Sequence, residues 1–264
     1  MTEKKKHIVL QTNNLAIGYS QRNNKIEIAN EISIELKKGE LVGLVGANGI
    51  GKSTLIRTLT NVQPKLNGTI HINNQLISNY TANELAKVLS LVLTEPIVSK
   101  NLSVYELIAL GRQPYTNWIG KLTAEDISVI DDAIAQSAIS DLKSKKCYEL
   151  SDGQLQKVMI ARALAQDTDL IILDEPTTHL DMYHKAYILK MLQNLSSETN
   201  KTILFSSHEI DLAIQLCDKM IVMTSENVVL DTPCNLISKG VFSNLFPKDL
   251  IAFDNNTGSF KVEK

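Results

Sequence analysis

The stretch GANGIGKST, Gly46–Thr54, matches the pattern GxxxxGK[ST] at every position. It follows the continuous apolar run Leu41–Val45 and precedes Thr54–Thr60, in which apolar residues recur at helical spacing. A strand, a glycine-rich loop and a helix in this order are the context that a phosphate-binding loop (P-loop) requires. The alternative is a glycine-rich turn with an incidental lysine, but a chance match in a chain of 264 residues is on the order of one in a hundred.

Each residue type in this loop has a physical task. Glycines let backbone N–H groups converge on phosphates, towards which the following helix also points its positive end. Lys52 supplies a charge for the β and γ phosphates, and Ser53 an oxygen for Mg²⁺. The nucleotide-binding residues predicted here are Gly46, Asn48, Gly49, Gly51, Lys52, Ser53 and Thr54.

A second element, LIILDEP at Leu170–Pro176, is an apolar strand that ends in two adjacent carboxylates. Asp174 is placed to hold Mg²⁺ through its water shell, and Glu175 to polarise an attacking water. Read alone, the pair is equally well an acidic turn after a strand. With the P-loop upstream, the catalytic interpretation is favoured.

A third element is LSDGQ, Leu150–Gln154, followed by helical spacing over Leu155–Ala165. Ser151 and Gly153 stand at the head of this helix, which makes a second potential phosphate-binding terminus. Two such termini in one chain suggest that two chains share each nucleotide. The alternative is a plain serine N-cap.

The chain predicts an α/β fold: a P-loop NTPase core with a mainly parallel sheet, an N-terminal antiparallel β sub-domain and a helical sub-domain. We expect one domain over 1–264, with a core at about 8–80 and 151–235, the helical sub-domain at about 81–150 and an extension at 236–264. The expected antiparallel segments are Ile8–Leu10, Leu15–Tyr19 and Ile32–Leu36, separated by asparagine-rich turns. In the second half the expected helices are Met182–Leu195 and Ile210–Leu216, and the expected strands are Leu170–Leu173, Thr202–Ser206 and Met220–Met223.

Two helix starts are marked by caps within the helical stretch. Ser103 precedes Val104–Leu110, and Thr123 with Asp126 precedes apolar residues at 3–4 spacing. Near the C-terminus, Asp254–Gly258 could turn a hairpin.

Composition excludes several classes of protein. The formal net charge of −2 supplies no overall basic field, so we expect no nucleic-acid partner. Three cysteines without metal-ligand spacing favour reduced thiols in the cytoplasm. Because no apolar run approaches 18 residues, any membrane role must come from a partner.

The four motifs in this order, namely the P-loop, LSDGQ with its helix, LDEPTTHLD and SSH at Ser206–His208, resemble the ATPase domain of the ABC superfamily. The resemblance covers roughly residues 8–235. It implies a head-to-tail homodimer with two ATP molecules, each held between the P-loop of one subunit and the LSDGQ helix of the other.

The same resemblance implies a role for each matching residue. Lys52, Glu175 and His208 would be catalytic, with Glu175 as general base and His208 on the γ-phosphate. Asp181 would close the loop that joins the two sites, and Tyr19 would stack on adenine. Ser151, Gly153 and Gln154 would bind the partner's nucleotide. Our interpretation leaves four other histidines as ordinary, namely His7, His71, His179 and His184, with His179 close to the dimer interface.

Two departures from the family pattern concern single positions. LSDGQ replaces the usual LSGGQ, so that a carboxylate at Asp152 comes close to the partner's phosphate, and we expect it to point away. In LSLVLTEP, the position of a family glutamine that senses Mg²⁺ holds Thr94, followed by Glu95. Thr94 is therefore predicted to contact the metal only because it occupies the position of this glutamine.

The helical stretch Ser103–Asp141, with ALGRQPY at Ala109–Tyr115, is similar to importers of iron chelates (siderophores), haem or cobalamin. In that group the stretch lies against a cytoplasmic helix of an integral-membrane permease. A substrate-binding protein delivers the substrate to this permease. The resemblance thus implies a location at the inner face of the cell membrane. The alternatives are a soluble ABC ATPase in a process such as cofactor assembly, and a regulatory module that barely hydrolyses ATP.

Overall fold

A six-stranded sheet forms the centre of the structure, a computed structural model that describes residues 7–21, 24–93, 100–246, 251–255 and 257–262. The strand order is β11-β10-β4-β9-β8-β7, in which β11 alone is antiparallel to its neighbour. The strands are β4 (Leu41–Gly46), β7 (Leu89–Val92), β8 (Leu170–Leu173), β9 (Thr202–Ser206), β10 (Lys219–Met223) and β11 (Val228–Asp231). The predicted α/β fold with a mainly parallel sheet is confirmed.

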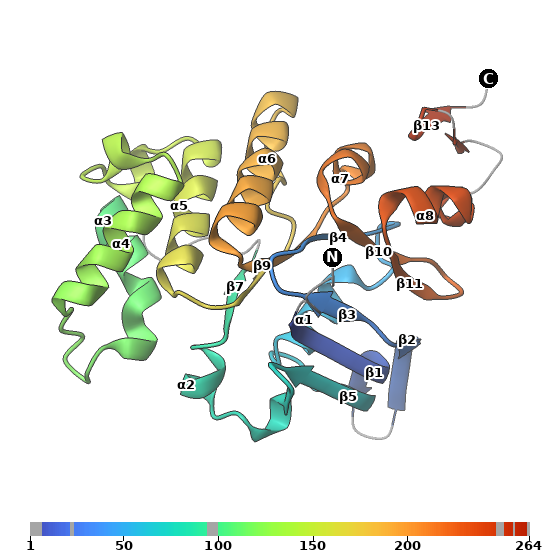
Figure 1. The fold of residues 1–264 in the computed structure, drawn as a ribbon, viewed down its shortest axis with the longest axis horizontal. Helices are drawn as coiled ribbons and strands as arrows, with labels where there is room; N and C mark the ends of the chain where they lie inside the picture. The colour runs from blue at the N-terminus through green and yellow to red at the C-terminus, as the bar shows by residue number, and fades with distance from the viewer. Residues whose placement is uncertain (1–6, 22–23, 94–99, 247–250, 256, 263–264) are drawn as a thin grey trace, which may run out of the picture.

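Both faces of this sheet are buried, which explains why its strands read as unbroken apolar runs. In β4, Leu41 and Val45 belong to one hydrophobic cluster, and Val42 and Leu44 to a second cluster on the opposite face. The helices that cover the sheet are α1 (Lys52–Leu59), α6 (Met182–Thr199) and α7 (Ile210–Leu216), with α8 (Pro233–Ser238) beyond β11 (Figure 1).

A second sheet is antiparallel and lies beside the first (Figure 1). It contains β1 (Ile8–Gln21), β2 (Asn24–Ile32), β3 (Glu35–Lys37), β5 (Asn67–Ile72) and β6 (Gln75–Leu76). The predicted division into short segments was wrong, because Ile8–Leu10 and Leu15–Tyr19 are one strand and Ile32–Leu36 is divided between two. Asn14 has φ 46°, a value that asparagine tolerates, and the register shifts beside it. The asparagines therefore make a bulge and not a turn.

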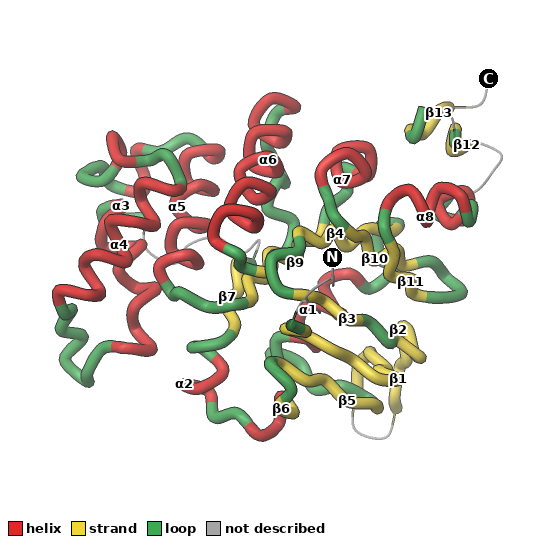
Figure 2. Tube along the Cα trace, viewed as in Figure 1, coloured by secondary structure: helices red, strands yellow, loops and turns green. Residues whose placement is uncertain are grey.

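The helical part lies at one end of the molecule and is almost wholly helix and loop (Figure 2). It contains α2 (Ala82–Leu85), α3 (Val104–Ala109), the 3₁₀ helix η2 (Leu110–Tyr115), α4 (Ala124–Gln136) and α5 (Asp152–Ala165). Further 3₁₀ turns are η1 (Ile77–Asn79), η3 (Ser140–Leu142) and η4 (Cys147–Glu149). Both predicted caps are confirmed, since Ser103 with Glu106 and Thr123 with Asp126 form capping boxes.

A buried ion pair fixes η2 to its neighbours. Nε of Arg112 donates to Oδ1 of Asp126 at 2.8 Å, and another guanidinium nitrogen donates to the carbonyl of Ala165 at 2.9 Å. A Cβ on Gly111 would lie 2.3 Å from the carbonyl oxygen of Arg162, so only glycine permits this approach of η2 to α5. Gly111 and Arg112 are therefore packing residues of the 3₁₀ helix that follows α3 without a break.

An ordered turn follows η2 and presents a tryptophan to solvent. Oδ1 of Asn117 accepts the N–H groups of Ile119 and Lys121, which fixes the turn from within. The side chain of Trp118 is 93% exposed.

The C-terminal segment ends in a hairpin of β12 (Ile251–Asp254) and β13 (Ser259–Val262), preceded by the 3₁₀ helix η5 (Val241–Asn244). Asp254 pairs with Ser259, which confirms the predicted turn. Across the described residues, no helix combines the length and the hydropathy that a membrane span needs.

Candidate nucleotide site

The P-loop joins β4 to α1 with the geometry that its glycines permit. Gly51 is the N-cap of α1 with φ 113°, and a Cβ there would lie 2.5 Å from Cγ2 of Ile28 in β2. A side chain is thus excluded both by the backbone and by the neighbouring strand. Asn48 and Gly49 are exposed on the loop, which leaves the backbone N–H groups there accessible to a ligand.

Lys52 is the charged centre of the loop. Its side chain is buried, and Nζ donates to the carbonyls of Gly46 at 3.0 Å and Ala47 at 3.2 Å. Burial lowers the pKa of Lys52, while the carboxylates of Glu175 and Asp174 oppose that shift. The loop therefore holds a desolvated ammonium group whose bonded partners among the described residues are neutral carbonyls, which favours the approach of an anion.

Three oxygen-bearing side chains meet at the carboxyl ends of β8 and β9. Oδ1 of Asp174 lies 3.3 Å from Oγ of Ser53 and accepts the hydroxyl of Ser206 at 2.7 Å. Hard oxygen donors of this kind suit Mg²⁺, which takes few protein ligands and keeps waters and phosphates as the others. No group of three or more His, Cys, Asp or Glu suited to a metal occurs among the described residues.

Glu175 is held in a strained backbone conformation by neighbours on both sides. Its φ is 49°, and its N–H donates to Oγ of Ser206 at 2.8 Å. One carboxylate oxygen lies 2.7 Å from Nε2 of His208, and the other accepts the hydroxyl of Thr178 at 3.1 Å. The structure thus brings Glu175 and His208 together. Ser206 and Thr178 lie within the quoted motifs, but their contacts could not be inferred from spacing.

Tyr19 lies at the edge of the same site. It pairs with Ile26 across β1 and β2, its side chain is 45% exposed, and its hydroxyl lies 3.0 Å from Oγ1 of Thr54 in α1. This bond holds the ring beside the helix that follows the P-loop.

The LSDGQ segment forms the start of α5. Ser151 is the N-cap, and it forms a reciprocal capping box with Gln154. Asp152 is the first residue of the helix and is exposed, where the helix dipole favours a carboxylate. The predicted N-cap is therefore present, and it leaves the other N–H groups of this terminus open to a ligand.

His184, interpreted from the sequence as an ordinary histidine, links this segment to the loop of Asp181. Asp181 is the N-cap of α6 and accepts the backbone N–H of His184 at 2.8 Å and approaches its Nδ1 at 2.9 Å. The backbone bond is the main cause that lowers the pKa of Asp181. A Cβ on Gly153 would lie 3.0 Å from the ring of His184, so the ring packs directly on the LSDGQ helix. The spacing of Asp181 and His184 across one helical turn was the available signal.

Within one chain, the two potential phosphate-binding helix starts do not meet. α1 lies against β1 and β4, whereas α5 belongs to the helical part and is separated from α1 in the view of Figure 1. Thr94 and Glu95 lie outside the described residues. His179 is exposed in the loop before α6, and His7 and His71 belong to the region of the antiparallel sheet.

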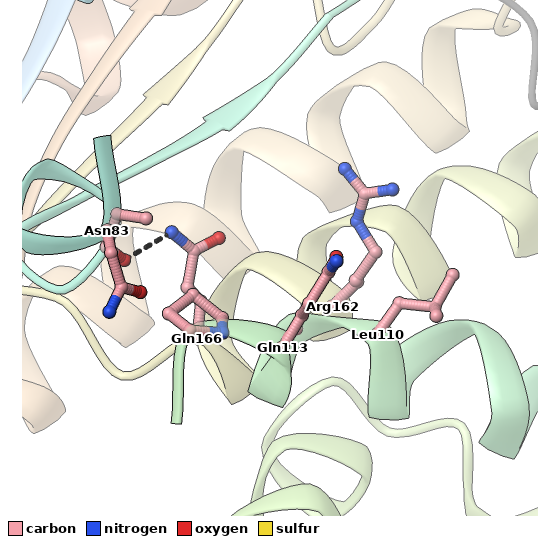
Figure 3. A pocket seen from close by; sticks show the side chains of 8 residues that line it. Asn83, Leu110, Gln113, Arg162 and Gln166 are labelled. Atoms are coloured by element: carbon pink, nitrogen blue, oxygen red, sulfur yellow. Dashed lines mark hydrogen bonds between the residues drawn. The ribbon is translucent and has the colours of Figure 1, made fainter. Parts of the chain in front are cut away.

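A separate cavity of about 510 Å³ lies between α2, η2 and α5 (Figure 3). Its lining residues are Asn83, Ala86, Leu110, Gly111, Gln113, Pro114, Arg162 and Gln166. The amide of Gln166 donates to the carbonyls of Ala86 and Leu89 at 2.7 and 3.0 Å, which ties α5 to the start of β7. The cavity therefore lies where the helical part joins the central sheet.

Comparison with known proteins identifies the family. The ABC transporter family model matches residues 29–178. An ABC transporter ATP-binding protein of Methanocaldococcus jannaschii is 34% identical over 257 residues, with 97% of this chain and 87% of the relative covered. The iron(3+)-hydroxamate import ATP-binding protein of Bacillus subtilis is 32% identical, with 91% of this chain and 88% of that relative covered.

Solved structures agree with this assignment. A transporter assigned to the metal-chelate ABC type, in an inward-facing conformation, has a TM-score of 0.78 at 25% identity, with 96% of this chain and 95% of the solved chain covered. The fold, the ordered motifs and the site geometry thus converge with the sequence relatives: the chain belongs to the ABC transporter family, as an ATPase that couples ATP hydrolysis to transport.

Proposed function

We propose that this chain hydrolyses Mg-ATP and powers an ABC importer for an iron chelate of the siderophore type. The hydrolysis of Mg-ATP is supported by one observation, namely that Lys52, Asp174 and Glu175 converge at the carboxyl ends of β4 and β8. These residues supply a buried cation for phosphate, an oxygen for a metal and a carboxylate for a water.

The chemistry assigns one role to each residue. Lys52 would exchange its bonds with the Gly46 and Ala47 carbonyls for phosphate oxygens, which are stronger, charge-assisted acceptors. Glu175 would orient the attacking water and accept its proton, and His208 would contact the γ-phosphate. Tyr19 would stack on the adenine from its position beside α1.

Ser53 and Asp174 fit a bound Mg²⁺, with Thr94 as a further contact predicted from the sequence alone. The ion supplies charge stabilisation for phosphoryl transfer when bound. Ser206 holds the Asp174 carboxylate in position for that role.

A head-to-tail homodimer is the arrangement in which this chain would complete its sites. The P-loop and the Ser151 terminus are apart in one subunit, so a second copy would bring Ser151, Gly153 and Gln154 to the nucleotide. Asp181 would contact the partner across the dimer, held in place by His184. We also propose that residues 1–264 act as a single ATPase domain.

The cavity between α2, η2 and α5 is the surface that we propose for an integral-membrane permease. Leu110, Gly111, Gln113 and Pro114, four of its eight lining residues, belong to the stretch Ser103–Asp141, for which the family resemblance implies contact with a permease helix, and Leu110 is exposed. The chain would then act at the inner, cytoplasmic face of the cell membrane. A substrate-binding protein would be an indirect partner, because it delivers the substrate to the permease.

The iron-siderophore cargo is supported by several relatives. Besides the hydroxamate importer, a siderophore transport ATP-binding protein of Bacillus subtilis is 32% identical over 238 residues. Haem and cobalamin, the other cargoes expected from sequence, stay predictions. The same relatives favour transport over an ABC ATPase in cofactor assembly.

The proposal is tested by capturing the tagged chain from detergent-solubilised membranes of its native cell and identifying its partners by mass spectrometry. A stoichiometric multi-span permease is expected, and cells that lack this chain should lose uptake of radiolabelled iron given as a hydroxamate chelate. Capture of soluble partners alone would contradict the permease, and unchanged iron uptake would contradict the cargo.

A further inference from the structure

Arg162 is a half-buried cation for which the described residues supply no charged partner. Its side chain leaves α5 and lines the cavity next to Leu110 and Gln113 (Figure 3). Burial lowers the pKa of the Arg162 guanidinium, and no charged group acts against that shift. Within the described part of the chain, no hydrogen bond or ion pair of this guanidinium occurs.

Arg112, which lies on the neighbouring η2, differs from Arg162 because its guanidinium has partners within the chain. Its guanidinium is paired with Asp126, donates to the carbonyl of Ala165 and lies 4.0 Å from the ring centroid of Tyr115. Of these two arginines on adjoining elements, Arg112 is thus paired, whereas none of the described residues supplies a partner for the guanidinium of Arg162.

The surroundings of Arg162 define what that partner must carry. None of the eight residues that line the cavity has a carboxylate. The nearby acid of α2, Glu84, is engaged in the capping box of Thr81, which lowers the pKa of Glu84 through that backbone bond. A guanidinium removed from water is stabilised most by a planar carboxylate, which can accept two parallel N–H bonds.

The cavity also favours a peptide segment over a free anion. Leu110, at 50% exposure, and Pro114 present apolar surface beside the charge. A free phosphate would use only the charge and the amide groups, whereas a protein segment can cover both kinds of surface.

We propose that Arg162 is the anchor for an aspartate or glutamate on a cytoplasmic segment of the permease, and that this ion pair helps to select the permease that the ATPase accepts. The inference rests on the proposed function and goes beyond it, because it names the group that the partner must carry. A guanidinium that no described residue pairs would then be paired with a carboxylate in the complex.

The test compares variants of the tagged full-length chain in its native cell, namely Arg162→Lys, Arg162→Gln and Arg162→Glu. The readout is the amount of permease captured per ATPase chain from detergent-solubilised membranes. We expect Arg162→Glu to lower capture at least about tenfold, and Arg162→Lys to keep most of it, since truncation of one partner of a buried charge pair is costly. Lys145→Glu is the matched control, because Lys145 is exposed and does not line the cavity. Thermal melting of each purified variant shows whether it is folded.

A charge exchange then tests the chemistry directly. Each acidic residue in the cytoplasmic segments of the captured permease is changed to arginine in cells that carry Arg162→Glu. Restoration of capture by one such change supports the ion pair. Equal capture by wild type and a folded Arg162→Glu variant would overturn the inference while leaving the proposed function intact.

Two further outcomes would also overturn it. If no exchange restores capture and Arg162→Glu instead abolishes binding of the purified chain to vesicles of anionic lipid, the cavity serves a lipid headgroup. If the wild-type chain captures no permease, the proposed function itself fails and the inference fails with it.

Discussion

Nε2 of His208 lies 2.7 Å from Oε1 of Glu175, so the histidine expected at the γ-phosphate and the carboxylate expected at the water are already bonded to each other. The other carboxylate oxygen of Glu175 is bonded to Thr178. Both oxygens of the proposed base are thus directed by neighbouring side chains. The fold itself therefore orients Glu175.

The Glu175→Gln variant should bind ATP yet lose at least about a hundredfold in turnover, because the amide keeps the shape of the side chain but cannot accept a proton. Gel filtration with Mg-ATP should then show a trapped dimer. Phosphate release measures the turnover. A variant that stays monomeric at saturating ATP would contradict the sandwich dimer, and one that hydrolyses normally would remove Glu175 as the base.

ATP affinity should fall as pH rises through the lowered pKa of Lys52. Burial lowers this pKa, so the side chain is charged below its shifted value and becomes neutral on the alkaline side sooner than an exposed lysine. Titration with a fluorescent ATP analogue between about pH 7 and pH 10 measures the trend.

Two variants of Lys52 serve as controls for that titration. Lys52→Ala should weaken ATP binding about ten- to a hundredfold at neutral pH, the effect of losing charge-assisted bonds to phosphate. Lys52→Arg keeps its charge throughout the range. An equally steep fall for the arginine variant would assign the pH dependence to another group.

Asp152→Gly should leave ATP affinity and turnover within about threefold of wild type. Asp152 is exposed at the first position of α5, where the positive end of the helix stabilises its charge. The carboxylate can therefore remain in solvent without burial near the partner's nucleotide. A sharp rise in affinity or turnover in the glycine variant, measured by the same two assays, would show that Asp152 points at the phosphate.

Asp126→Asn should destabilise the fold by about 3–5 kcal/mol, because it leaves the buried guanidinium of Arg112 without its counter-charge. Chemical denaturation at neutral pH measures the loss. The backbone N–H of Thr123 is the first cause that lowers the pKa of Asp126, and Arg112 adds to it. The contribution of the carboxylate is therefore complete above the unfolded-state pKa, about 3.9, and disappears as pH falls through the lower folded-state value.

The difference between the variant and wild type should accordingly shrink below about pH 4. Asp131→Asn is a suitable comparison, since Asp131 pairs with Lys143 at the surface and such pairs contribute about 0–1 kcal/mol. Equal losses for the two variants would contradict the special role of the buried pair.

The elements that the sequence predicted well are those with local signals. β8, β9 and α7 have the predicted bounds, and the capping residues Ser103 and Thr123 start their helices as expected. Apolar runs and capping boxes depend on residues that are close in the sequence, so one amino-acid sequence contains enough information to predict these elements. The strand and the helix on either side of the loop Gly46–Gly51 were predicted for the same reason.

What the sequence could not supply depends on contacts between distant segments. The single strand β1 was divided because asparagines are read as turns, whereas the pairing of β1 with β2, β3 and β5 keeps the strand continuous. Arg112 and Asp126 are 14 residues apart, and nothing in their spacing pairs them. His184 looked ordinary because its contact with Gly153 joins the starts of two helices, α5 and α6, that only the fold brings together.

The turn at Asn117–Gly120 gives this chain a built-in spectroscopic reporter. Trp118 is the chain's one tryptophan, and it stands on a turn that follows directly after the cavity-lining helix η2. Intrinsic fluorescence excited at the indole band therefore reports on a single, solvent-facing position. Any macromolecule that covers this edge of the helical part should shift that emission to the blue, without a label and without altering a residue.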